Sequence, residues 1–108
     1  MQLYVGEEIA MGPGKADLLD AIEATGSISA AGRAMGMSYR RAWMLVDAMN
    51  RCFAQPLVET HPGGGQQAGA KVTELGREMR EAYRKVVEQA ESGTQGAALE
   101  ALTKALKG

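Results

Sequence analysis

The sequence predicts a mainly α-helical winged helix-turn-helix domain with a small β-hairpin wing and a long C-terminal dimerisation helix. Three observations indicate this fold. Residues 27–53 read as two short helices joined by a tight turn, residues 57–73 as two strands around a glycine-rich tip, and residues 74–91 as one amphipathic helix. We assign residues 1–92 to the domain and residues 93–108 to a linker and a short C-terminal amphipathic helix.

The chain before the motif predicts a strand, a loop and a bracing helix. Residues 2–5 are typical of a short strand, and residues 6–14 of a loop in which Met11 can plug the core. Residues 15–25 predict an amphipathic helix that ends at Gly26. We expect this helix to support the two helices that follow.

The helix-turn-helix segment has a suitable residue at each cap and at its turn. Ser27 and Ser38 can each accept a hydrogen bond from an unpaired amide at the start of the following helix. Gly36 suits the turn because a residue without Cβ adopts positive φ at little cost. Arg40 and Arg41 then fall in the first turn of the second helix, the part that reaches base edges in DNA-binding motifs.

Positive charge is concentrated in the same segment. Residues 1–26 carry one lysine against five acidic residues, whereas residues 27–53 carry four arginines against one aspartate. The net charge of the whole chain is only −1. Because binding to DNA depends on where positive charge meets phosphate, the local excess favours DNA binding. The alternative is an ordinary helical hairpin with solvated arginines.

The segment after the second helix predicts the wing. Residues 57–60 and 71–73 are typical of strands, and the segment between them, HPGGGQQAGA, is rich in glycine and almost uncharged. A hairpin placed directly after a recognition helix can lie along a DNA groove and offer backbone amides to phosphate.

Other kinds of site find little support in the sequence. Gly64 and Gly69 have the separation of a phosphate-binding loop, but Ala70 stands where that loop needs lysine. His61 has no cysteine or acidic cluster at metal-ligand spacing, so we expect no metal and no cofactor. No nucleophile lies beside a base, so we expect no enzyme. The lone Cys52 and the lack of a membrane-spanning apolar run favour a cytoplasmic protein.

Apolar residues recur at three- and four-residue steps along residues 74–91, and Thr73 can cap this helix. We expect its first part to pack on the domain. The part from Tyr83 is expected to extend past the core and to pair with its copy in a second chain. The alternative is a helix that folds back on its own chain. The predicted dimerisation residues are Tyr83, Val86, Val87 and Ala90.

Trp43 and the methionines are more typical of a core than of a binding site. We expect Trp43 to lie between helices rather than on DNA. Four of the seven methionines fall at helical core positions, where the flexible thioether fills gaps. These four are Met35, Met37, Met49 and Met79.

Residues 18–87 resemble the N-terminal DNA-binding domain of the ModE family, molybdate-responsive transcriptional regulators with a LysR-type winged helix-turn-helix. The segments GSISAAGRAMGMSYRRAW, LVDAMN and LVETHPGGGQQAGAKVTELG carry the resemblance. The resemblance places Ser38, Tyr39, Arg40, Arg41 and Trp43 in the recognition helix, and Gly63, Gly64 and Gly65 in the wing. The predicted DNA-binding residues are Ser27, Ser38, Tyr39, Arg40, Arg41, Gly63, Gly64, Gly65 and Lys71.

The expected function is that of a sequence-specific DNA-binding regulator, acting as a homodimer on a palindromic site. Family members that sense molybdate carry oxyanion-binding domains after the long helix, whereas this sequence ends at Gly108 after one short helix. We therefore expect a stand-alone regulator that does not bind molybdate tightly. Two alternatives are a winged-helix module for protein interaction and a regulator that senses a small oxyanion or another ligand.

Overall fold

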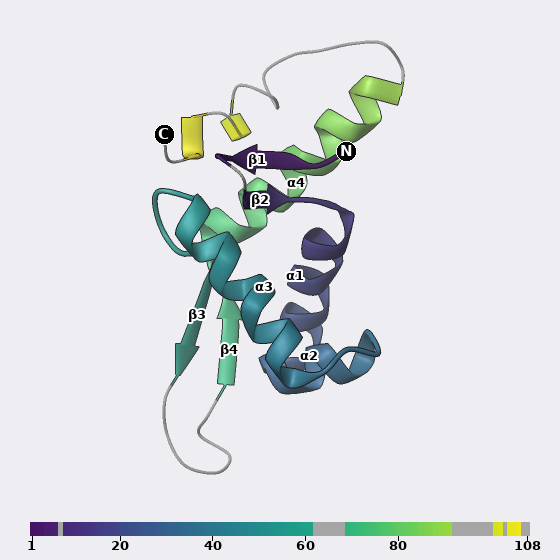
Figure 1. Cartoon of the computed structure of the whole chain (residues 1–108), viewed down its shortest axis with the longest axis vertical. Helices are drawn as coiled ribbons and strands as arrows, with labels where there is room; N and C mark the ends of the chain where they lie inside the picture. The colour runs from purple at the N-terminus through teal and green to yellow at the C-terminus, as the bar shows by residue number, and fades with distance from the viewer. Residues whose placement is uncertain (7, 62–68, 92–100, 103, 107–108) are drawn as a thin grey trace.

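The computed structural model describes residues 1–6, 8–61, 69–91, 101–102 and 104–106 (Figure 1). The elements run in the order β1 (Leu3–Val5), β2 (Glu8–Met11), α1 (Pro13–Thr25), α2 (Ile28–Ala34), α3 (Tyr39–Cys52), β3 (Val58–His61), β4 (Gly69–Val72) and α4 (Glu74–Glu91). The predicted fold class, mainly α-helical with a small hairpin wing and a long final helix, is confirmed.

The bracing helix α1 begins at Pro13, two residues before the predicted start. Proline suits this position because the first amide of a helix has no partner within the helix. Gly26 ends α1 with a φ of 78°, and its amide donates a hydrogen bond to the Ile22 carbonyl. The buried face of α1 includes Lys15 as well as the expected leucines and isoleucine.

The two helices of the motif are capped as predicted. The Ser27 hydroxyl oxygen accepts a hydrogen bond from the Ala30 amide at 2.9 Å. The Ser38 hydroxyl oxygen accepts one from the Arg41 amide at 3.1 Å. Gly36 has a φ of 71°, the left-handed conformation that the turn requires. Ser27 and Ser38 thus mark where α2 and α3 begin, and Gly36 forms the turn between them.

The prediction of a loop over residues 6–14 is wrong for Glu8–Met11, which forms β2 and pairs antiparallel with β1. The residues of β2 do not alternate between buried and exposed, because Ala10 and Met11 are both buried. A strand of four residues without alternation leaves no periodic signal in the sequence. Met11 does fill the core as expected, although it does so from a strand.

The wing is the antiparallel pair β3–β4, in which Val58 faces Val72 and His61 faces Gly69. Its tip, including Gly63, Gly64 and Gly65, lies outside the residues that the structure describes. The Ala70 amide of β4 donates a 2.8 Å hydrogen bond to the carbonyl of Gly26. This bond ties the wing to the turn between α1 and α2.

The long helix α4 spans 74–91 as predicted, and the Thr73 hydroxyl oxygen accepts a hydrogen bond from the Gly76 amide. Tyr83 and Val86, however, are only 3% and 5% exposed within a single chain. The expectation that α4 leaves the core from Tyr83 onward is therefore wrong for these two residues. The Tyr83 hydroxyl donates a hydrogen bond to the Met1 carbonyl, so the start of the chain covers this part of the helix.

The described part of the C-terminal segment also packs on the domain. Leu102 is fully buried in the common core. The Ala54 amide donates a 2.9 Å hydrogen bond to the Ala105 carbonyl, and Leu106 pairs with Phe53. Residues 101–102 and 104–105 are helical, whereas the rest of the helix expected over residues 97–106 lies outside the described residues. Among the described helices, none is long and apolar enough to cross a membrane.

Candidate nucleic-acid interface

The outer face of α3 exposes large apolar side chains. Tyr39 is 55% exposed, Trp43 40% and Met44 60%. The expectation that Trp43 lies in the core is therefore wrong. Its spacing of four residues from Tyr39 already put the two on one helical face, whereas the buried stripe runs through Ala42 and Val46.

Arg40 and Arg41 lie exposed in the first turn of α3, as predicted. Neither guanidinium forms an ion pair with any carboxylate of the described residues. Arg51, near the other end of α3, is paired with Glu8 at 2.6 Å and Asp47 at 2.8 Å. The uncompensated positive charge of this helix therefore lies at its N-terminal end.

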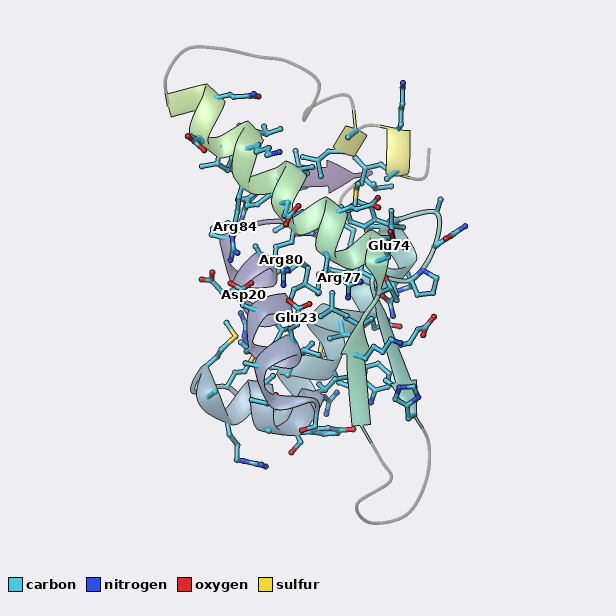
Figure 2. The ribbon with its side chains drawn as sticks, turned by 180° about the vertical axis from the view of Figure 1, so that it is seen from behind. Asp20, Glu23, Glu74, Arg77, Arg80 and Arg84 are labelled. Atoms are coloured by element: carbon cyan, nitrogen blue, oxygen red, sulfur yellow. The ribbon has the colours of Figure 1, made fainter. Side chains whose placement is uncertain are left out.

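The arginines of α4 are paired with the acidic side chains of α1 (Figure 2). We name this group the α1–α4 ion cluster; it consists of Asp17, Asp20, Glu23, Arg77, Arg80 and Arg84. Arg80 bonds Glu23 at 2.6 Å, and Arg84 bonds Asp20 at the same distance. The hydrogen bond that Arg84 donates to the Asp20 carboxylate raises the pKa of Arg84. Three of the five acidic residues that made residues 1–26 so negative are thus neutralised by α4.

A groove of about 260 Å³ lies between the wing and the two helices of the motif. Its walls bring together residues from the start of α2, the start of α3 and both wing strands, including Ser27, Tyr39, Trp43, His61 and Ala70. The predicted contacts Ser27 and Tyr39 therefore lie in one groove although they come from different helices. Lys71 is exposed on β4, paired with Glu59 of β3, and does not line this groove.

A second depression, of about 560 Å³, lies on the other flank of α3. We name it the Lys15 depression; its lining includes Glu8, Ile9, Lys15, Ser38, Arg40, Arg41, Met44, Leu45, Asp47, Ala48 and Arg51. Lys15 is only 9% exposed. Burial lowers the pKa of Lys15, and the nearby Arg41 lowers it further, against the opposing effects of Cys52 and Glu8.

The sequence interpretation did not single out Lys15 as a binding residue. The signal was nevertheless present, because Lys15 precedes Leu18, Leu19 and Ile22 by three, four and seven residues. That spacing puts the lysine on the apolar face of α1. A lysine at such a position needs either an acidic partner within the chain or a ligand that carries negative charge.

Asn50 is a second residue that sequence reasoning missed. Its side-chain oxygen accepts hydrogen bonds from the amides of Leu57 and Val58, and its side-chain amide donates to the Val58 carbonyl at 3.0 Å. These three bonds join the end of α3 to the first wing strand. Asn50 therefore fixes the first wing strand relative to α3.

Metal and thiol chemistry find no support in the described part of the chain. No group of three or more histidine, cysteine or acidic side chains gathers there as metal ligands do. His61 is exposed on β3. Cys52 is buried, and burial raises the pKa of its thiol, so the reactive thiolate is disfavoured.

Curated relatives of this chain are molybdenum-related proteins and regulators, whereas no family model matches it. Over 73 residues it is 48% identical to the molybdenum-pterin-binding protein MopB of Rhodobacter capsulatus, covering 68% of this chain and 27% of the relative. Over 67 residues it is 42% identical to the molybdenum transport protein ModE of Azotobacter vinelandii, covering 62% and 25%. Over 83 residues it is 31% identical to the DNA-binding transcriptional dual regulator ModE of Escherichia coli, covering 77% and 32%.

The matches cover most of this chain but only about a quarter to a third of each relative. The similarity therefore concerns one part of those longer proteins. The resemblance that the helix-turn-helix and glycine-rich segments indicated is confirmed. This chain is homologous to one part of the ModE proteins and of the molybdenum-pterin-binding protein MopB.

Proposed function

We propose that this chain binds duplex DNA as a sequence-specific transcriptional regulator, with α3 as the recognition helix. One observation carries the proposal: Arg40 and Arg41 are exposed at the start of α3 without an acidic partner among the described residues. A guanidinium that is not neutralised by its own chain is available to a phosphate or a guanine edge. The similarity to the DNA-binding transcriptional dual regulator ModE of Escherichia coli supports this choice.

The residues around the two arginines fit complementary roles. Arg40 and Arg41 would reach bases or phosphates, and Tyr39 a backbone group or a thymine methyl group. The Ser38 hydroxyl oxygen accepts from the Arg41 amide, which leaves its hydrogen free for a phosphate oxygen. Trp43 adds apolar surface to the same face. Ser27, Lys71 and the wing glycines Gly63, Gly64 and Gly65 would complete the contacts to the backbone.

The test begins with selection of bound sequences from a random duplex pool. Fluorescence anisotropy then compares the parent with the double variant Arg40→Ala/Arg41→Ala on selected and scrambled duplexes. Loss of a base contact should cost about 1–3 kcal/mol on the selected site, and loss of a phosphate contact should reduce the salt slope by about one. Lys85→Ala, which removes one exposed charge of α4, is the control for loss of positive charge away from α3. A folded double variant that binds like the parent would refute α3 as the recognition helix.

We further propose that the chain forms a symmetric dimer, which would place two recognition helices on a palindromic site. Of the predicted stripe, Val87 is half-buried and Ala90 exposed, so the last turns of α4 remain available to a second chain. Ala90→Glu should shift the protein from dimer to monomer in sedimentation velocity, with an unchanged circular dichroism spectrum. Val86→Glu cannot test dimerisation, because Val86 is buried in its own chain and the substitution would destabilise the monomer. A parent protein that stays monomeric with and without DNA would contradict the dimer.

The second candidate function is a winged-helix module for protein interaction. The exposed apolar strip of Tyr39, Trp43 and Met44 favours it, because contiguous apolar surface often marks an interface. Salt dependence separates the two functions, since phosphate neutralisation by the arginines makes DNA affinity fall steeply as salt rises. If no duplex from the pool binds, the interaction module becomes the better proposal.

A further inference from the structure

The Lys15 depression contains a largely buried lysine that no carboxylate of the described residues binds directly. Lys15 is 9% exposed, and no hydrogen bond or ion pair joins its side chain to the residues that the structure describes. A charge taken out of water without a partner costs stability. Because leucine or methionine would fill this position on α1 at no such cost, the lysine points to a ligand with negative charge.

The carboxylates in the depression are already engaged. Glu8 and Asp47 both line it, and Arg51 binds the two of them at 2.6 and 2.8 Å. Arg51 thereby neutralises much of their charge. Lys15, Arg40 and Arg41 remain as the cations of the depression that no carboxylate of the described residues binds directly, and Arg41 is near enough to lower the pKa of Lys15. The electrostatic surroundings therefore favour an anion.

The depression also opens toward the proposed DNA face. Arg40, Met44 and Asp47 line both the Lys15 depression and the outer surface of α3. The wing groove flanks α3 on its other side, where Tyr39 and Trp43 lie. When a recognition helix enters the major groove, the two phosphate backbones run along its two flanks. The wing would face one backbone, and the Lys15 depression the other.

We propose that the Lys15 depression binds a phosphate group of the DNA backbone, held by the Lys15 ammonium and the Arg41 guanidinium. This inference deepens the proposed function and rests on it. Two cations around one phosphate form charge-assisted hydrogen bonds, which are shorter and stronger than neutral ones. The contact would position α3 in the groove without reading sequence, because every base pair presents the same backbone.

The first arm of the test measures DNA binding by anisotropy over a range of salt concentrations. Lys15→Met should weaken binding to selected and scrambled duplexes by the same factor, about tenfold, and reduce the salt slope by about one. Lys85→Met removes the same charge from the exposed face of α4 and should change neither quantity. If Lys15→Met fails to fold, Lys15→Gln takes its place. A Lys15 variant that binds DNA as Lys85→Met does would overturn the proposal.

The second arm probes the depression without DNA. Inorganic phosphate is added at constant ionic strength while amide chemical shifts are followed by NMR. Weak but saturable shifts should appear at residues around the depression, such as Ile9, Ser38 and Arg41, and Lys15→Met should abolish them. Shifts that never saturate, or that persist in Lys15→Met, would overturn the anion site.

The two arms separate failure of this inference from failure of the proposed function. If the parent binds no duplex, the proposed function and the backbone contact both fail. Saturable phosphate binding that depends on Lys15 would then assign the depression to a free oxyanion instead. If the parent binds DNA and the Lys15 variant binds equally well, only the inference fails.

Discussion

Two groups of arginines on this chain have opposite surroundings. In the α1–α4 ion cluster, Arg80 and Arg84 each contact carboxylates of α1, at distances from 2.6 to 3.2 Å. At the start of α3, Arg40 and Arg41 have no such partner among the described residues. The first group joins two helices of the fold. The proposed function rests on the second group, whose charge no carboxylate of the described residues neutralises.

The same contrast recurs between two buried cations. Arg80 and Lys15 are both 9% exposed, yet Arg80 bonds Asp20 and Glu23 whereas Lys15 bonds neither Glu8 nor Asp47. Equal burial therefore has different consequences for stability. Removing a paired buried cation leaves its carboxylate partners without that ion pair and is destabilising. Removing an unpaired buried cation relieves a desolvation cost.

The largest expected effect comes from giving the α3 arginines a partner of their own. Met44→Glu would place a carboxylate four residues after Arg40 and three after Arg41, on an exposed position. Stability should change by less than about 0.5 kcal/mol, because such surface pairs are weak. DNA affinity should fall about 100-fold, since the new charge also repels phosphate. Anisotropy measures the loss, and Met44→Gln, which adds no charge, should retain much more of the affinity.

Arg80→Met should lower the free energy of unfolding by about 2 kcal/mol. The substitution keeps an apolar stem but removes the 2.6 Å ion pair of Glu23 and the 3.2 Å ion pair of Asp20 in a partly buried setting, and Asp20 then keeps only Arg84. Urea denaturation followed by circular dichroism measures the change. DNA affinity of the folded variant should match that of the parent. A variant as stable as the parent would show that the cluster does not hold α4 on α1.

Lys15→Met should have the opposite effect to Arg80→Met and raise the free energy of unfolding by about 1 kcal/mol at neutral pH. Because burial lowers the pKa of Lys15, the parent is penalised while the lysine is charged. That penalty fades as pH rises from the folded-state pKa toward the ordinary value for lysine, so the gain of the variant should shrink in alkali. Among the described residues, Glu8, Arg41 and Cys52 are the charged or titratable groups that act on the lysine. A gain that does not depend on pH would contradict this explanation.

Arg84→Met should have the smallest effect, a loss of less than about 1 kcal/mol. Its side chain is 44% exposed, and its partners Asp17 and Asp20 are more exposed still. Exposed ion pairs contribute little, and salt screens them. Urea denaturation at low and high salt measures the free energy of unfolding, and its difference from the parent should disappear in high salt. A difference that persists in high salt would mean that packing of the Arg84 stem contributes more to stability than its ion pairs do.

The local signals in the sequence were sufficient for most of the elements. Ser27, Gly36 and Ser38 marked the caps and the turn of the motif, and the structure has each in that role. The apolar spacing of residues 74–91 gave the bounds of α4, with Thr73 as its cap. These features depend on neighbours within about one helical turn, and such neighbours are visible in a sequence.

Only the tertiary structure decided which groups are covered and which charges are paired. It buried Tyr83 and Val86 in their own chain, with the Tyr83 hydroxyl bonded to the Met1 carbonyl, and it formed β2 from residues that show no periodic pattern. It also set the acids of α1 against arginines some sixty residues later, as in Arg80 and Glu23. A count of charges by segment cannot separate neutralised arginines from available ones, because pairing depends on segments that only folding brings together.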